Sequence, residues 1–117
     1  MPFTIVDGTG PIINVKISGE IDKTEVTQIQ AAALGAIQRC GKIRALFILD
    51  NFRGWKRDGN WGDISFMTQH DQEIVKIAVV GDEQWRDLVC AFLAKGFRAA
   101  AVEYFVPTDL PKARAWL

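Results

Sequence analysis

A nearly unbroken apolar run, Arg44-Ala45-Leu46-Phe47-Ile48-Leu49-Asp50, lies near the middle of the 117-residue chain. A strand with one face in water alternates apolar and polar residues, and this run does not, which predicts a strand covered on both faces. Residues 75–80 form a second such run, which ends at Gly81-Asp82. Because stretches of helical periodicity separate these runs, the sequence indicates an α/β arrangement.

The flanking sequence supplies the other expected elements of this arrangement. Strands are predicted over residues 3–6, 12–18, 44–50, 75–80 and 101–106. The best-defined helix follows Asp22, which forms a capping-box pattern with Glu25, and it ends at Gly41. Its apolar stripe has helical spacing and contains Val26, Ile29, Ala33, Ile37 and Cys40.

Three further helices complete the predicted order, β-β-α-β-α-β-α-β-α, in a single domain over residues 1–117. A short helix is expected over residues 61–70. Asp82 is expected to cap the next helix, which ends at Gly96, and Thr108 or Asp109 to cap the last one. The apolar stripe of the helix after Asp82 contains Trp85, Leu88, Val89 and Phe92. Phe47 and Ile77 are expected to be buried, so truncating either to Ala would cost about 2–5 kcal/mol.

Composition argues against two classes of partner. Fourteen basic and fourteen acidic side chains balance, whereas nucleic-acid binding needs a cluster of cations. The longest apolar run is far below the roughly 20 residues that cross a bilayer. We therefore expect no nucleic-acid partner and no membrane span. The first residues lack the features of a secretory signal, so a cytoplasmic location is expected.

No constellation of residues in the sequence has the pattern of a catalytic, cofactor or metal site. There is no GxGxxG, phosphate loop or HExxH motif, and Cys40 and Cys90 lack zinc-ligand spacing and are expected in apolar helix faces. Neither Ser18 nor Ser65 sits in a nucleophile elbow. His70 is the single histidine. We therefore expect a protein that is not an enzyme.

The segment after residue 50 is the most informative part of the chain for function. Asp50 and Asn51 are predicted at the carboxyl end of a strand, where ligands of α/β sheets gather, although their side chains could also cap a turn. Residues 52–61 place aromatic and basic residues in a glycine-punctuated loop, a composition typical of binding surfaces. The aromatic residues could instead fold back over the core. The candidate ligand- or partner-binding residues are Asp50, Asn51, Phe52, Arg53, Trp55, Trp61, Phe66 and His70.

Several segments carry a resemblance to a known family. They are residues 76–85 (Lys-Ile-Ala-Val-Val-Gly-Asp-Glu-Gln-Trp), 102–105, 113–117 and 41–46, the last followed by the aromatic loop with Trp61 and His70. This pattern resembles the SpoIIAA-like family of small bacterial domains, which are of STAS/SEC14 type. The resemblance implies a mixed, largely parallel five-stranded sheet flanked by helices.

The resemblance also implies two kinds of binding function. Anti-sigma-factor antagonists of this type bind a kinase partner and are switched by phosphorylation of a Ser that follows an Asp after the middle strand. This chain has Asp50-Asn51 there, and Asn accepts no phosphate, so the switch does not carry over. SEC14-type domains enclose lipids, and a chain of this length would hold a small apolar pocket covered by the loop of Phe52, Trp55 and Trp61.

Three hypotheses follow from these observations. The first is a noncatalytic protein-interaction or regulatory module that binds a protein partner or a second copy of itself as a homodimer. The alternative is a carrier or sensor of a small apolar or lipid-like ligand under residues 52–66. The third, which no motif favours, is an enzyme that uses His70 with Asp63 or Asp50.

Overall fold

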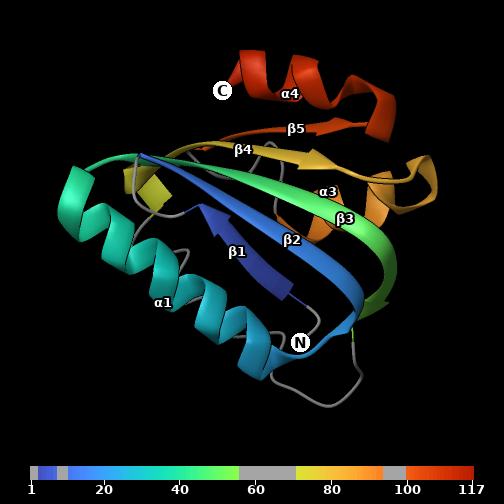
Figure 1. The fold of residues 1–117 in the computed structure, drawn as a ribbon, viewed down its shortest axis with the longest axis horizontal. Coiled ribbons are helices and arrows are strands. Elements are labelled where there is room, and N and C mark those ends of the chain that lie inside the picture. The colour runs from blue at the N-terminus through green and yellow to red at the C-terminus, as the bar shows by residue number, and fades with distance from the viewer. Residues whose placement is uncertain (1–2, 8–10, 56–70, 94–99) are drawn as a thin grey trace.

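The computed structural model describes residues 3–7, 11–55, 71–93 and 100–117. Figure 1 shows these residues as one sheet between helices. The strands are β1 (Phe3–Asp7), β2 (Ile12–Ile21), β3 (Ile43–Trp55), β4 (Ile74–Val80) and β5 (Ala101–Phe105). The helices are α1 (Lys23–Cys40), α3 (Arg86–Phe92) and α4 (Leu110–Trp116), with single 3-10 turns at Asp71–Glu73, Glu83–Trp85 and Pro107–Asp109.

The five described strands lie in the order β1-β2-β3-β4-β5. β1 is antiparallel to β2, and every later neighbour is parallel. The predicted α/β class, a parallel sheet flanked by helices, is therefore confirmed. The helix predicted over residues 61–70 and the helix end predicted at Gly96 lie outside the described residues.

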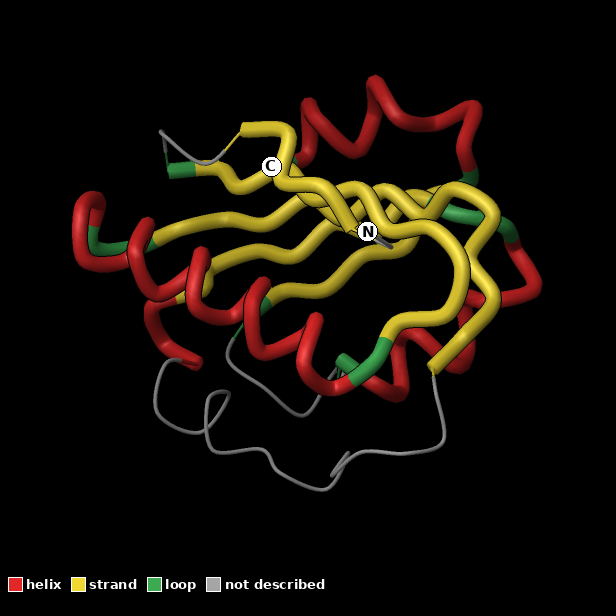
Figure 2. Tube along the Cα trace, turned by 60° about the horizontal axis from the view of Figure 1, so that its bottom comes forward, coloured by secondary structure: helices red, strands yellow, loops and turns green. Residues whose placement is uncertain are grey.

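Helices cover both faces of the sheet. α1 and α3 lie on one face and α4 on the other (Figures 1 and 2). Successive side chains of a strand point to opposite faces, so Ala45 joins the larger core under α1 and α3, whereas Leu46 joins a smaller core under α4. Ile77 is 3% exposed, as expected, but Phe47 is only half-buried.

β2 and β3 are longer than predicted, because the two strands continue together. β2 does not end at Gly19: it runs through this residue at φ 68°, with register shifts on either side. Beyond the shifts, Gly19, Glu20 and Ile21 pair with Phe52, Gly54 and Trp55. The prediction that Asp50 and Asn51 lie at the carboxyl end of a strand is therefore wrong, since both lie inside β3.

Within the described residues, α1 begins and ends at its predicted caps, whereas the caps predicted for the later helices make no side-chain hydrogen bond. In α1 the amide of Glu25 donates to Asp22 Oδ1 at 2.8 Å and the amide of Asp22 donates to Glu25 Oε1 at 2.9 Å, and Gly41 ends the helix at φ 85°. Asp82 makes no capping bond, because the chain enters a 3-10 turn there and α3 starts later. Asp109 makes none either, and its carboxylate lies 3.7 Å from Lys112 Nζ.

The predicted apolar stripes are also partly wrong. Cys40 is exposed and Cys90 is half-buried. In the short helix α3, Val89 is buried, but Leu88 is 56% and Phe92 43% exposed. A helix of two turns presents few positions to the sheet, so its remaining apolar side chains stay at the surface. No helix in the described part of the chain is both long and apolar enough to cross a bilayer.

Candidate functional site

A cavity of about 400 Å³ lies between the sheet and the helices α1 and α3. Its floor consists of side chains of β2, β3 and β4 that point away from α4, among them Val15, Ala45 and Ile77. Ala33 of α1 and Val89 of α3 line it from the helical side. These side chains are aliphatic because the strands run through the core, so the site is built from the same residues that hold the fold together.

Two polar side chains interrupt this apolar lining. Among the described lining residues, Lys23 and Gln30 are the only two that are neither aliphatic nor aromatic. Both belong to α1, seven residues apart, and both are half-buried. A seven-residue spacing on a helix returns to the same face two turns later. The polar part of the cavity therefore lies along one side of α1.

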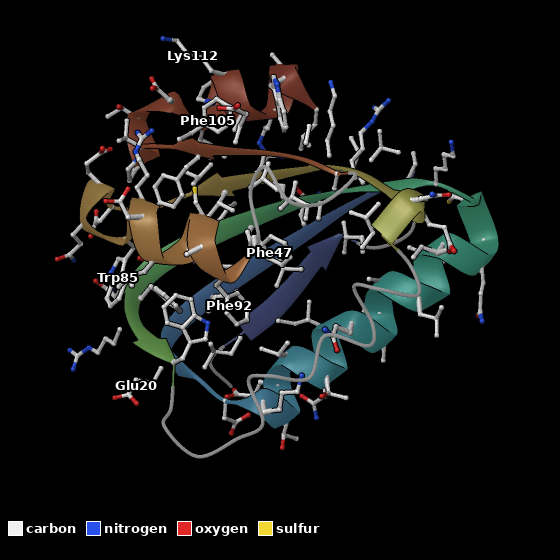
Figure 3. All side chains as sticks on the ribbon, turned by 180° about the vertical axis from the view of Figure 1, so that it is seen from behind. Glu20, Phe47, Trp85, Phe92, Phe105 and Lys112 are labelled. Carbon is white, nitrogen blue, oxygen red and sulfur yellow. The ribbon has the colours of Figure 1, made fainter. Side chains whose placement is uncertain are left out.

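An aromatic cluster borders the cavity at the carboxyl end of β3. The ring of Phe52 lies 5.3 Å from Trp55 and 5.1 Å from Trp85, and Trp55 lies 5.1 Å from Phe92. Gly54 makes this packing possible, since a Cβ there would lie 3.3 Å from the Trp85 ring. Of this cluster, Phe52, Trp55 and Phe92 line the cavity. Figure 3 shows Phe47 and Phe92 on the same side of the sheet, and both line the cavity.

The structure separates the predicted site residues into three groups. Phe52 and Trp55 line the cavity. Asp50, Asn51 and Arg53 are exposed, and Asp50 forms an ion pair of 3.3 Å with Lys16. Since the preceding residue, Leu49, points into the cavity, Asp50 points to the other face of the sheet. The remaining three candidates, Trp61, Phe66 and His70, lie outside the described residues.

A second cluster of polar groups lies where β4 ends. The Tyr104 hydroxyl donates to the backbone oxygen of Asp82 at 2.7 Å, and burial of Tyr104 raises its pKa to about 12. The Arg86 guanidinium lies 5.5 Å from the Tyr104 ring and donates to Glu83 at 2.8 Å. A phenol with a raised pKa stays neutral at physiological pH and serves as a hydrogen-bond donor rather than a base. The Tyr104 hydrogen bond therefore links β5 to the segment that follows β4.

Sequence reasoning missed Lys23, Gln30, Phe47 and Phe92 as site residues. Lys23 and Gln30 continue the spacing of Val26 and Ala33 on α1, and that signal could have identified them. Phe47 was assigned to the core instead. Phe92 lines the cavity, and its ring lies 5.1 Å from that of Trp55, which is far away in the sequence, so only the folded structure brings it to the site.

Comparisons with known proteins agree with this fold. A solved structure of an uncharacterised protein from Shewanella loihica PV-4, described as a DUF3478 family member with a SpoIIAA-like fold, is similar with a TM-score of 0.69 and 20% identity. The match covers 91% of this chain and 83% of the other. None of the curated proteins matches the sequence. The profile of the SpoIIAA-like family matches residues 12–117. The chain, with its parallel sheet and helices on both faces, belongs to the SpoIIAA-like family.

Proposed function

We propose that the protein is a noncatalytic binding domain that holds a small apolar ligand in the cavity between the sheet and the helices α1 and α3. The cavity itself carries the proposal. Its volume of about 400 Å³ falls within the range of small-molecule sites. Ordinary protein interiors contain few voids larger than a water molecule.

The apolar lining also supports the proposal, because a small apolar ligand would bury its own surface against these side chains. A ligand that binds only the folded protein stabilises it, so binding and stability are expected to be coupled.

Mass spectrometry and a fluorescent probe test the proposal together. Native spectra of freshly purified protein, followed by denaturing spectra, are expected to reveal an extra mass that is lost on denaturation. An environment-sensitive apolar dye should bind the protein after this mass is removed. A protein without the extra mass that also leaves the dye in water would contradict the proposal.

A matched pair of variants locates the bound dye. Ala33 lines the cavity, whereas Ala31 is exposed on the same helix. The added carbons of Ala33→Leu occupy space that the ligand needs, and a buried methylene is worth about 0.8 kcal/mol. We expect Ala33→Leu to weaken dye binding about tenfold or more and Ala31→Leu to leave it unchanged. Equal effects would place the dye elsewhere.

A second candidate function, a protein-interaction module, is favoured by the exposed apolar residues of α3. Leu88 is 56% and Phe92 43% exposed. An antagonist-like module of this kind would work without the phosphorylation switch, since the family resemblance of the sequence puts Asn51 in the place of the Ser that those proteins phosphorylate. Sedimentation would detect a homodimer, and Leu88→Ser should weaken it. An unchanged association constant in that variant would count against this surface.

A further inference from the structure

We infer that small apolar ligands enter and leave the cavity between α1 and α3, and that the side chain of Phe92 controls the rate of this exchange. The inference rests on the proposed function and adds the route by which the site is filled and emptied. Two observations carry it. One is the uneven exposure of the residues that line the cavity, and the other is the position of Phe92 at the end of α3.

The strand side of the cavity is closed to solvent. Val15 of β2 and Ile77 and Val79 of β4 line the cavity, and their exposed fractions are 1%, 3% and 1%. On the other face of the same sheet, Leu46 and Ala78 are 0% exposed in the core under α4. Close packing of this kind blocks a path through the sheet.

The helical side of the cavity is more accessible. Ala91 and Phe92 of α3 also line the cavity, yet both are exposed, Phe92 to 43%. On α1, the lining residues Lys23 and Val26 are half-buried, whereas Ala33, two turns further along, is 8% exposed. The wall of the cavity therefore reaches the surface at the end of α3 and at the first turns of α1.

The two helices that border the cavity pack against the sheet rather than against each other. α1 and α3 cover the same face of the sheet (Figures 1 and 2), and in the described part of the chain they hardly touch each other. α1 packs against β2 and β3, and α3 packs against β5. An opening between the two helices therefore requires neither of them to leave the sheet.

Phe92 stands at this opening. It is the last residue of α3 (Figure 3), and its ring lies 5.1 Å from that of Trp55, which lines the cavity from β3. The ring thus bridges the α3 wall and the β3 wall. Exposed side chains change rotamer within nanoseconds, so the ring can swing away from Trp55 while α3 stays folded. The rate of ligand entry then depends on the fraction of molecules in which the ring has moved away.

Stopped-flow fluorescence measures this exchange. Protein freed of ligand is mixed with Nile red, an environment-sensitive apolar dye, and the dependence of the observed rate on protein concentration gives the association rate constant. We expect Phe92→Ala to raise this constant about two- to tenfold, the factor that corresponds to the loss of one aromatic contact. Phe92→Trp carries a larger ring and is expected to lower it.

The association rate constant distinguishes a residue at the entrance from one that only contacts the bound ligand. Truncating a contact residue weakens affinity mainly through faster dissociation. Val79→Ala represents this case, because Val79 is buried in the cavity wall, and it should speed dissociation rather than association. Val75→Ala is the control for an exposed apolar side chain. Val75 is 39% exposed and lies outside the lining, so both rate constants should match those of the wild type.

The outcomes separate the inference from the function beneath it. A wild-type association rate constant in Phe92→Ala would overturn the entrance at Phe92 and leave binding in the cavity in place. Faster association of the same size in Val79→Ala or Val75→Ala would also overturn it, because the effect would not depend on the position of Phe92. Failure of Nile red to bind the wild-type protein would instead overturn the proposed function.

Discussion

At the scale of single residues, Tyr104 gives the protein a defined response to high pH. Its pKa is raised from 10.0 to about 12, first by burial and then by the nearby charge of Asp82. The folded state therefore keeps the phenol proton in a range where the unfolded chain releases it. The contribution of Tyr104 to stability is complete below pH 10 and is lost as the pH rises towards 12.

Tyr104→Phe separates this contribution from that of other titrating groups. Below pH 10 the variant should be less stable by about 1 kcal/mol, because the hydrogen bond to Asp82 is lost. Between pH 10 and 12 the wild type should lose stability relative to the variant, so the difference shrinks. Urea unfolding of both proteins across this range measures it. A difference that stays constant to pH 12 would contradict the raised pKa.

Gly81 is required by the same contact. A Cβ at this position would lie 2.7 Å from the Tyr104 hydroxyl and 2.9 Å from Leu49. We expect Gly81→Ala to destabilise the protein by about 1–3 kcal/mol, as overpacking does. Gly35→Ala is the control, because its nearest neighbour is the flexible end of Arg39 at 3.5 Å. In α1 this substitution should stabilise by up to about 1 kcal/mol. Denaturation midpoints that move the same way for both would contradict the packing argument.

At the scale of elements, two aspartates that the sequence predicts as helix caps behave differently. Asp22 caps α1, whereas Asp82 precedes a 3-10 turn and caps nothing with its side chain. Asp22→Ala should therefore cost about 1 kcal/mol of unfolding free energy. Asp82→Ala should cost much less, contrary to the expectation from sequence. Chemical denaturation of both variants measures the difference. An equal loss of unfolding free energy would indicate that Asp82 caps a helix after all, as the sequence predicts.

The extension of β2 and β3 explains which part of the sheet the sequence could predict. Residues 12–18 and 44–50 show strand patterns that local reading detects. Beyond them the strands continue through Gly19, Asn51 and Gly54, which have φ angles of 68°, 55° and 100°. Residues in this conformation interrupt the alternation, so they read as turns. Only pairing between residues distant in the sequence, such as Gly19 with Phe52, identifies them as strand.

The candidate site was predictable to a similar extent. An aromatic segment next to a strand pointed to Phe52 and Trp55, and both line the cavity. The same segment suggested Asp50, which the pleat of β3 turns to the opposite face. Lys23 has the helical spacing of Val26 and Ala33, so the sequence could place it on the same face of α1. That this face borders a cavity depends on the packing of whole elements, which single-sequence patterns do not encode.

At the scale of the whole molecule, the two faces of the sheet differ in how closely they are packed. The face under α4 is closely packed, and Leu46 there is 0% exposed. The face under α1 and α3 contains the cavity, and half-buried Phe47 borders it. Neighbouring residues of one strand thus belong to a closely packed core on one side and to the cavity that we propose as a binding site on the other.

Truncating Leu46 and Phe47 to Ala should affect the stability of the protein and its affinity for the apolar dye to different extents. Leu46→Ala is expected to cost about 2–5 kcal/mol of unfolding free energy, because it opens a void in a packed core. Its affinity for the apolar dye should match that of the wild type at a temperature where both are folded. Phe47→Ala removes a side chain that already borders open space, so we expect a smaller stability loss and a changed dye affinity. Denaturation and dye titration on the same samples measure both quantities. If Leu46→Ala altered dye affinity as much as Phe47→Ala, the two faces would be coupled, and the cavity could not be treated as a site separate from the packed core.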